Sequence, residues 1–138
     1  MMAEKARLFM DSHPDNADIL KAILVSNSPR EQKELGRQVK GFIDSEWVKI
    51  AKDVVYKASV AKFSQNVKLK EQLLATGDLT LVEASPVDLR WGIGYAANDP
   101  EAQEPHKWRG LNWLGEAIMR ARKTIRAEAT ITGSCSPI

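Results

Sequence analysis

The feature that most constrains the fold is a row of apolar residues at helical spacing in the middle of the chain. Three- and four-residue steps separate its members, which are Trp47, Ile50, Ala51, Val54, Ala58 and Ala61. Such spacing places side chains on one face of an α-helix. Asp44 stands just before the row and is suited to cap a helix. We therefore expect a central core helix after Asp44 and a fold built mainly from helices.

Shorter helices are expected on both sides, over residues 1–10, 15–25, 29–38 and 67–75. Ser28 and Glu31 form a capping box with Pro29 at the first helical position, which marks a helix start. Gly77 follows the fourth of these helices and can adopt the left-handed conformation that ends a helix. No capping residue precedes the first helix, so the chain looks as if it begins inside a helix.

The second half of the chain predicts a small strand component. Residues 79–84 alternate in character and contain β-branched residues, which favours a short strand. A polar loop follows at 98–106, and Asn112 can cap a last helix whose apolar stripe runs to Ile125. We expect a mainly α (α+β) fold, a compact helical domain over residues 1–126 with a few short strands, and a flexible tail over 127–138.

Composition excludes several classes of protein. The chain has 138 residues, 43% of them hydrophobic, and a net charge of +2, which fit one globular domain and not a strongly basic nucleic-acid binder. No apolar run approaches the roughly 20 residues needed to cross a membrane. Cys135 is the only cysteine, so an intramolecular disulfide framework is excluded, and we expect a cytoplasmic protein.

The residue types of a binding pocket are concentrated between Asp88 and Gly94. This irregular segment holds Asp88, Trp91, Gly92 and Gly94. One interpretation is structural, with Asp88 bonded to turn amides and Trp91 in the core. The other is functional: Trp91 stacks on a flat heterocycle, the glycines let backbone approach a ligand, and Asp88 binds a sugar hydroxyl or stabilises positive charge. Position alone leaves both open.

Four further residues have two interpretations each. Asn112 either caps a helix or contributes to an anion or hydroxyl site at the helix N-terminus. Arg37 and Lys62 are either solvated or hold a phosphate. Lys5 is either exposed or a partly desolvated amine that attacks an anomeric carbon and forms a Schiff base. The two histidines are far apart in sequence, and no spacing supports a metal site.

Taken together, the segments resemble the NADAR domain family, whose members include the riboflavin biosynthesis intermediates N-glycosidase. The resemblance covers roughly residues 1–122 and rests on an ordered set of motifs rather than on any single one. The set comprises Ala3-Glu4-Lys5-Ala6, Glu34-Leu35-Gly36-Arg37, Trp47, Lys62-Phe63-Ser64-Gln65-Asn66, Leu73-Leu74-Ala75-Thr76-Gly77-Asp78, Leu81-Val82-Glu83-Ala84-Ser85, Asp88, Trp91-Gly92-Ile93-Gly94 and Asn112-Trp113-Leu114-Gly115.

The resemblance implies an N-glycosidase that hydrolyses the N-glycosidic bond of phosphorylated ribosylamino-pyrimidine intermediates. Its implied catalytic residues are Lys5, at the sugar, and Asp88. Substrate binding is implied for Trp91, Gly92, Gly94, Asn112, Arg37 and Lys62, with Arg37 and Lys62 at the phosphate. No metal or other cofactor is implied. The implied partner is a small phosphorylated ribosyl molecule, and neither a membrane nor a particular oligomeric state is indicated.

The sequence departs from the family pattern at its start. Family members carry a β-rich segment ending in a Glu-His-Tyr-like run, with a glutamate expected to be catalytic, before the helix that holds Lys5. That segment is absent here, so we expect an N-terminally truncated domain with exposed apolar surface. The missing glutamate favours one alternative, a non-catalytic module that binds NAD or ADP-ribose. A second alternative uses similar sugar chemistry on a larger substrate: a hydrolase that removes ADP-ribose from guanine in nucleic acid.

Overall fold

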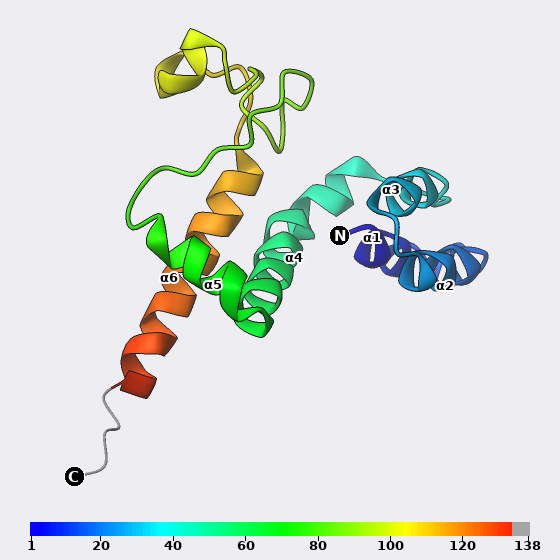
Figure 1. Cartoon of the computed structure of the whole chain (residues 1–138). Coiled ribbons are helices and arrows are strands. Elements are labelled where there is room, and N and C mark those ends of the chain that lie inside the picture. Colours follow the sequence, from blue (N-terminus) through cyan, green and yellow to red (C-terminus); the bar gives the residue numbers. More distant parts are fainter. Residues whose placement is uncertain (134–138) are drawn as a thin grey trace. The chain divides into compact units, whose positions relative to one another are not determined.

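The computed structural model describes residues 1–133, which form helices joined by loops (Figure 1). It divides into two compact units, residues 1–54 and the residues from Val55 onward. The boundary lies within α4 (Asp44–Gln65).

The first unit is a three-helix cluster followed by the first part of α4. It contains α1 (Met2–Leu8), α2 (Asn16–Val25) and α3 (Pro29–Arg37), which pack against one another in all three pairs. Their shared core is apolar, and its buried members are Ala6, Phe9, Ile23 and Val39. All three helices lie close to their expected ranges. The predicted N-cap is confirmed, because the Glu31 N–H donates to Ser28 Oγ at 3.3 Å and Pro29 is the first helical residue. The reciprocal bond of a capping box is not formed, since the Ser28 N–H donates to Ser26 Oγ at 3.2 Å and Ser26 Oγ donates to the Glu31 carboxylate.

A buried asparagine ties the end of this cluster together. Asn16 is fully buried, and its side-chain amide donates to the carbonyl oxygens of Phe9, at 3.1 Å, and Lys40, at 3.0 Å. Its Oδ1 accepts from the Lys40 N–H at 2.9 Å. Each backbone group that Asn16 pairs would otherwise be costly to bury. The segment after α3 is thereby fixed to the loop after α1.

The long helix α4 begins at Asp44, as expected, but its buried row differs from the predicted one. Trp47, Ala51, Val55 and Ser59 are buried at steps of four residues. Ala58 and Ala61, expected in the core, are exposed. Residues four positions apart form a single row along a helix. The two alanines lie at the border of that row, and their side chains have too little apolar area to favour burial of a different face.

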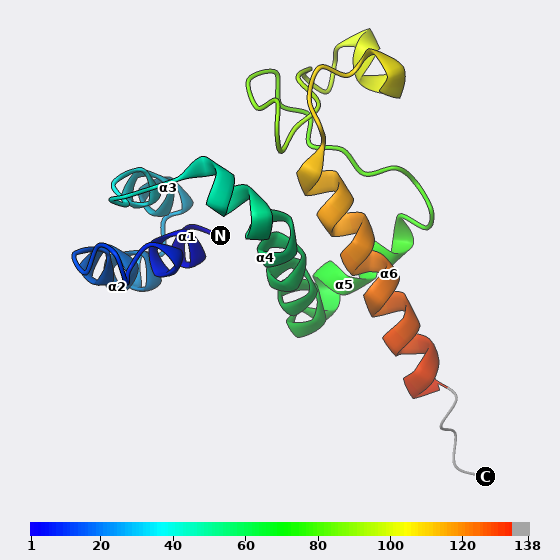
Figure 2. The ribbon, with the colours of Figure 1, turned by 180° about the vertical axis from the view of Figure 1, so that it is seen from behind.

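The second unit contains the part of α4 from Val55 onward, α5 (Val67–Ala75), α6 (Trp113–Gly133) and the long connection between α5 and α6. Helices α5 and α6 contact each other in both ribbon views (Figures 1 and 2). The connection includes two 3₁₀ turns, η1 (Pro100–Gln103) and η2 (Pro105–Lys107). The buried residues of α6 are Gly115, Ala117, Ala121, Arg122 and Ile125, which confirms most of the apolar stripe predicted for this helix.

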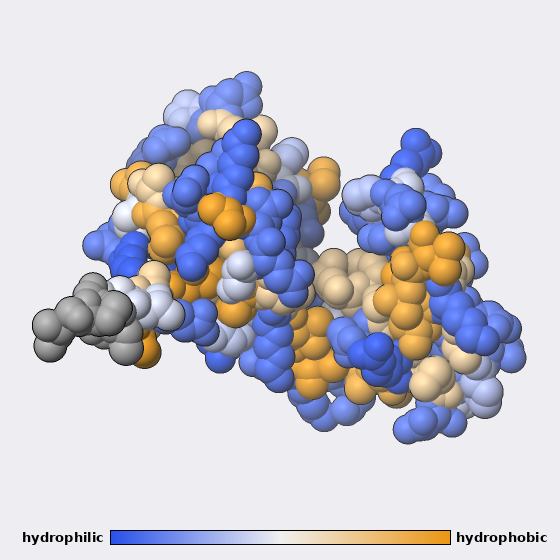
Figure 3. Space-filling model, turned by 60° about the horizontal axis from the view of Figure 1, so that its bottom comes forward, coloured by the Kyte–Doolittle hydropathy of each residue, from blue (hydrophilic) through white to orange (hydrophobic). Residues whose placement is uncertain are grey.

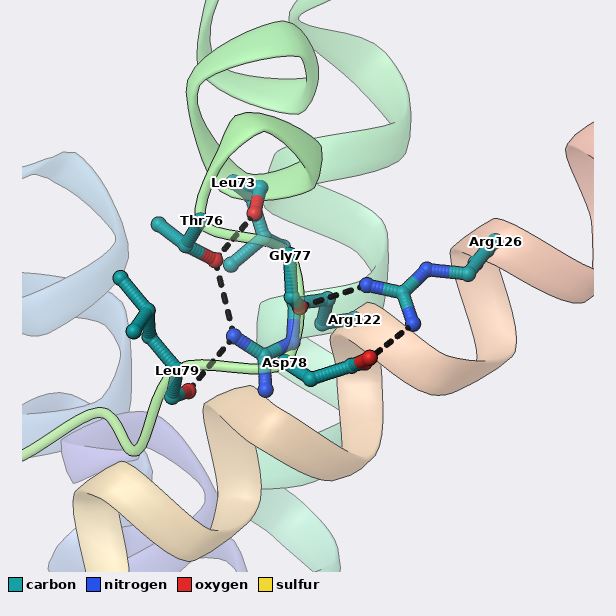
Figure 4. Close-up of polar contacts among 7 residues, drawn as sticks. All are labelled: Leu73, Thr76, Gly77, Asp78, Leu79, Arg122 and Arg126. Atoms are coloured by element: carbon teal, nitrogen blue, oxygen red, sulfur yellow. Dashed lines mark hydrogen bonds and ion pairs between the residues drawn. The ribbon is translucent and has the colours of Figure 1, made fainter.

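Two arginines of α6 hold the chain where it leaves α5 (Figure 4). Arg122 is buried, and its Nη1 donates to Thr76 Oγ1 at 2.8 Å and to the carbonyl oxygen of Leu79 at 2.9 Å. One turn later, Arg126 donates to Asp78 Oδ1 at 2.8 Å and to the carbonyl oxygen of Gly77 at 2.6 Å. Gly77 has a φ of +58°, as predicted for the residue that ends a helix. These bonds fix the start of the connection on the surface of α6.

The strand predicted over residues 79–84 is wrong, and no strand is present within residues 1–133. The segment pairs with a side chain instead of with another strand. Asn112 Nδ2 donates to the carbonyl oxygen of Leu81 at 2.9 Å, and Asn112 Oδ1 accepts from the N–H of Glu83 at 3.0 Å. The mainly α class is confirmed, whereas the strand component is not.

Two other expectations concern the ends and the surface. Helix α6 continues to Gly133, beyond the point at residue 127 where a tail was predicted, and residues 134–138 lie outside the described part.

Apolar and polar areas alternate over the face shown in Figure 3. The most exposed large apolar residues are Val87, Val25, Leu79, Ile131 and Val67. None of the described helices is long and apolar enough to cross a membrane.

Candidate functional site

Asp88 organises a tight turn and keeps one carboxylate oxygen unbonded. Its Oδ1 accepts from the N–H groups of Arg90, at 3.0 Å, and Trp91, at 2.8 Å, and its own N–H donates to Ser85 Oγ at 3.2 Å. Its Oδ2 has no hydrogen-bond partner within residues 1–133. The structural interpretation of Asp88 is therefore confirmed. It is compatible with the functional one, because the turn fixes one carboxylate oxygen of this half-buried residue and leaves the other unbonded.

Trp91 lies beside Asp88 and packs edge to face against Trp113 at the start of α6. The two ring centroids are 5.6 Å apart, with an interplanar angle of 89°. The guanidinium of Arg90 lies 5.6 Å from the Trp113 ring. Trp91 is only half-buried, so part of its indole remains available for contact. The predicted stacking of Trp91 on a ligand ring stays a prediction.

Gly92 and Gly94 are required by close packing within the protein. A Cβ on Gly92 would lie 2.8 Å from the carbonyl oxygen of Asp88 and 3.0 Å from that of Glu83. Gly94 has a φ of +78°, and a Cβ there would lie 2.8 Å from Arg109 Cβ. Larger residues at either position would displace backbone. Both glycines are buried, so they shape the loop, while the predicted approach to a ligand remains untested.

Asn112 has both ends of its side-chain amide bonded to Leu81 and Glu83, as described above, and is 3% exposed. It precedes α6, as predicted, but with a φ of +53°, and it bonds the preceding segment rather than its own helix. The first amides of α6 are also used, because the N–H groups of Trp113 and Leu114 donate to the carbonyl oxygens of Arg90 and Trp91. The predicted contact of Asn112 with substrate stays a prediction.

Lys5 lies in the first unit in a partly desolvated position. Its Nζ donates to the carbonyl oxygen of Gly36 at 2.8 Å and lies 4.0 Å from the centroid of the Phe42 ring. Burial lowers the pKa of Lys5 from its usual 10.5, and the negative charge of Asp44 partly opposes this change. A lowered pKa raises the fraction of neutral amine, which is the nucleophilic form. Of the two interpretations of Lys5, partial burial is the one that the structure supports, and its attack on a sugar stays a prediction.

Arg37 and Lys62 are exposed. Arg37 lies in the last turn of α3, next to Gly36, and Lys62 lies in α4 with its Nζ 5.7 Å from the Phe63 ring. The structure thus gathers five candidates in the second unit, namely Asp88, Trp91, Gly92, Gly94 and Asn112. It places Lys5 close to the helix of Arg37 in the first unit. Phosphate binding by the two exposed cations remains a prediction.

Sequence reasoning missed one residue, Glu83. Its backbone is bonded on both sides, since its N–H donates to Asn112 and its carbonyl oxygen accepts from the N–H groups of Ser85 and Ile93, both at 3.0 Å. The residue as a whole is half-buried, and its carboxylate forms no hydrogen bond or ion pair within residues 1–133. The signal was an acidic residue in an otherwise mostly apolar extended segment. Within the same residues, no acidic, histidine or cysteine side chains cluster as metal ligands.

Comparison of the chain with known proteins identifies its family. The NADAR domain model matches residues 1–126, and the chain belongs to this family.

Individual relatives carry more specific names. The chain is 41% identical over 123 residues to N-glycosidase R617 of Acanthamoeba polyphaga mimivirus, covering 89% of this chain and 69% of that protein. It is 39% identical over 110 residues to Protein irg-1 of Caenorhabditis elegans, covering 78% and 52%. It is also 37% identical over 117 residues to Riboflavin biosynthesis protein PYRR, chloroplastic, of Zea mays, covering 82% and 17%. The curated relatives thus include a protein named as an N-glycosidase, which is a hydrolase that acts on N-glycosyl bonds, and a protein named for riboflavin biosynthesis.

Proposed function

We propose that this chain is an N-glycosidase that hydrolyses the N-glycosidic bond of phosphorylated ribosylamino-pyrimidine intermediates of riboflavin biosynthesis. The observation that carries the proposal is Asp88, whose Oδ1 is fixed by two backbone N–H groups while its Oδ2 is unbonded. The similarity to an N-glycosidase supports the reaction class. The similarity to PYRR supports the choice of substrate.

The chemistry requires a group that stabilises positive charge on the sugar. Cleavage of a glycosidic bond passes through an oxocarbenium-like transition state, and a fixed carboxylate stabilises that charge without having to reorganise. Asp88 is fixed in this way by the turn it organises. Trp91, next to it and half-buried, supplies an apolar face for the leaving base.

The other candidates have separate roles in the proposal. Lys5 is the candidate covalent or electrostatic group at the sugar, on the ground of its lowered pKa. Arg37 and Lys62 are the candidate phosphate ligands, because they are exposed cations. Gly92, Gly94 and Asn112 maintain the shape of the loop that holds Asp88. The active domain spans residues 1–126, and its substrate is a diffusible cytoplasmic molecule.

Two alternatives use the same residues differently. A hydrolase of ADP-ribosyl-guanine in nucleic acid would apply the same sugar chemistry to a larger partner. A non-catalytic module would bind NAD or ADP-ribose without breaking a bond.

Mass spectrometry of reaction products, together with calorimetry for binding, distinguishes the proposed function from its two alternatives. The chain is incubated separately with the ribosylamino-pyrimidine phosphate, with an ADP-ribosylated guanine oligonucleotide and with NAD. Free pyrimidine and ribose phosphate from the first substrate support the proposal. Unmodified guanine from the second favours the alternative hydrolase. Binding of NAD or ADP-ribose by calorimetry, with no product from any substrate, favours the binding module and contradicts the proposal.

A further inference from the structure

Most carboxylates of the second unit are used by the protein itself. Asp78 is paired with Arg126, and Asp99 Oδ2 accepts from the Ala96 N–H at 2.7 Å. Glu104 is paired with Lys107 at 2.8 Å. Two half-buried glutamates in this unit have no side-chain partner within the described residues, Glu83 and Glu101. Neither carboxylate therefore contributes a hydrogen bond or ion pair to the fold of the described residues, and each is available for another role.

Glu83 differs from Glu101 in how firmly its backbone is held. Three hydrogen bonds fix the Glu83 backbone. Its N–H donates to Asn112 Oδ1, and its carbonyl oxygen accepts from the N–H groups of Ser85 and Ile93. The N–H and carbonyl oxygen that anchor Glu83 contact two different parts of the unit, the start of α6 and the loop after Trp91. Glu101 lies instead in the short η1 turn. The Glu83 side chain therefore projects from one of the most constrained points of the connection.

Gly92 brings Glu83 close to Asp88. The carbonyl oxygens of both residues lie within 3.0 Å of the position that a Cβ on Gly92 would occupy. The backbones of the two acidic residues therefore converge on the same glycine. Asp88 has a free Oδ2, and Glu83 has a free carboxylate. Hydrolysis of a glycosidic bond commonly uses two carboxylates, one of which activates water.

We propose that Glu83 is the second carboxylate of the site and acts as the general base, an inference that rests on the N-glycosidase function proposed above. Glu83 takes one proton from a water molecule while the water oxygen forms a bond to the anomeric carbon. The C–N bond breaks and its electron pair stays on the leaving nitrogen, which takes a proton from solvent. Glu83 then returns its proton to solvent. Asp88 stabilises the positive charge that develops on the sugar during the step.

The test compares Glu83→Gln with Glu101→Gln, a matched change at the other half-buried, unpartnered glutamate. Loss of a general base lowers kcat by about 100-fold or more, and we expect this loss for Glu83→Gln with an unchanged melting temperature. Glu101→Gln is expected to keep the wild-type kcat. Glu83→Asp retains the charge but shortens the side chain, and should fold and show an intermediate kcat.

A chemical rescue separates catalysis from a structural role. Formate is a small carboxylate that can occupy the space left by Glu83→Ala. We expect it to raise the rate of this variant at least about tenfold, which is a partial recovery of the roughly 100-fold or larger factor that a positioned general base contributes. Formate should not change the rate of Glu101→Ala. A wild-type kcat for Glu83→Gln, or no effect of formate on Glu83→Ala, would overturn this inference alone. A wild-type chain that releases no product would overturn the proposed function and this inference with it.

Discussion

Asn112 Oδ1 accepts a hydrogen bond from the backbone N–H of Glu83 at 3.0 Å, across 29 positions of sequence. The same side chain donates to the carbonyl oxygen of Leu81. One amide therefore satisfies two backbone groups that a neighbouring strand would pair in a sheet. It joins the start of α6 to the extended segment that holds Glu83, and so connects the scaffold of the second unit to its candidate site.

Replacing Asn112 by alanine should destabilise the chain. The change leaves the Leu81 carbonyl and the Glu83 N–H without their partner, and each unsatisfied buried group costs about 1–3 kcal/mol. The φ of +53° at this position adds a further penalty for alanine. Urea unfolding should show a loss of about 2–6 kcal/mol for Asn112→Ala from the two unpaired groups. Asn98→Ala, at an exposed asparagine of the same connection, is the control and should change little. Equal stability of the two variants would contradict the bracing role of Asn112.

The packing of α6 against the extended segment predicts a second effect. A Cβ on Gly115 would lie 2.1 Å from the carbonyl oxygen of Leu81. Overpacking of this kind costs about 1–3 kcal/mol, so Gly115→Ala should lower the melting temperature. Gly133→Ala is the control on the same helix, because nothing lies within 4 Å of its added Cβ. If Gly115→Ala melts at or above the temperature of Gly133→Ala, the close approach of α6 to Leu81 is incorrect.

Lys5 predicts a change of stability with pH. Burial lowers the pKa of Lys5 below its unfolded value of 10.5, so between the two values the unfolded chain binds more protons. The free energy of unfolding contributed by Lys5 therefore rises with pH in the alkaline window that ends near 10.5. Urea unfolding across this window should show that Lys5→Met removes the rise.

The control for this measurement is Lys33→Met, at an exposed lysine of α3. It should leave the rise with pH in place, because Lys5 is still present. The same slope in wild type and Lys5→Met would contradict the desolvation of Lys5.

Sequence patterns predicted the local structure well because its causes are local. The start of α3 is defined by three residues close together, Ser28, Pro29 and Glu31. Gly77 follows α5 and has the positive φ expected of a residue that ends a helix. The apolar spacing also located α4 and α6. These signals depend on residues that are near one another in the chain, so no knowledge of the tertiary structure was needed.

The errors arose where distant residues decide the outcome. The alternation of residues 79–84 is typical of a strand, but the partner of this segment is the side chain of Asn112. Asp88 and Trp91 could be found as candidates because they stand in a distinctive loop. For Glu83 the sequence carries only a weak signal, its acidity in a mostly apolar segment, because its fixed backbone and its proximity to Asp88 depend on Asn112, Ile93 and Gly92.

The most direct test of the proposed function is the rate of base release from the ribosylamino-pyrimidine phosphate by wild type, Asp88→Asn and Asp99→Asn. The two variants form a matched pair, because one carboxylate oxygen of each aspartate accepts from backbone N–H groups, two at Asp88 and one at Asp99, and asparagine retains an acceptor oxygen. We predict that wild type and Asp99→Asn release the base at similar rates, and that Asp88→Asn is slower by about 100-fold or more, as loss of an electrostatic stabiliser requires. All three should melt at similar temperatures. Release by Asp88→Asn at the wild-type rate, or no release by wild type, would contradict the account.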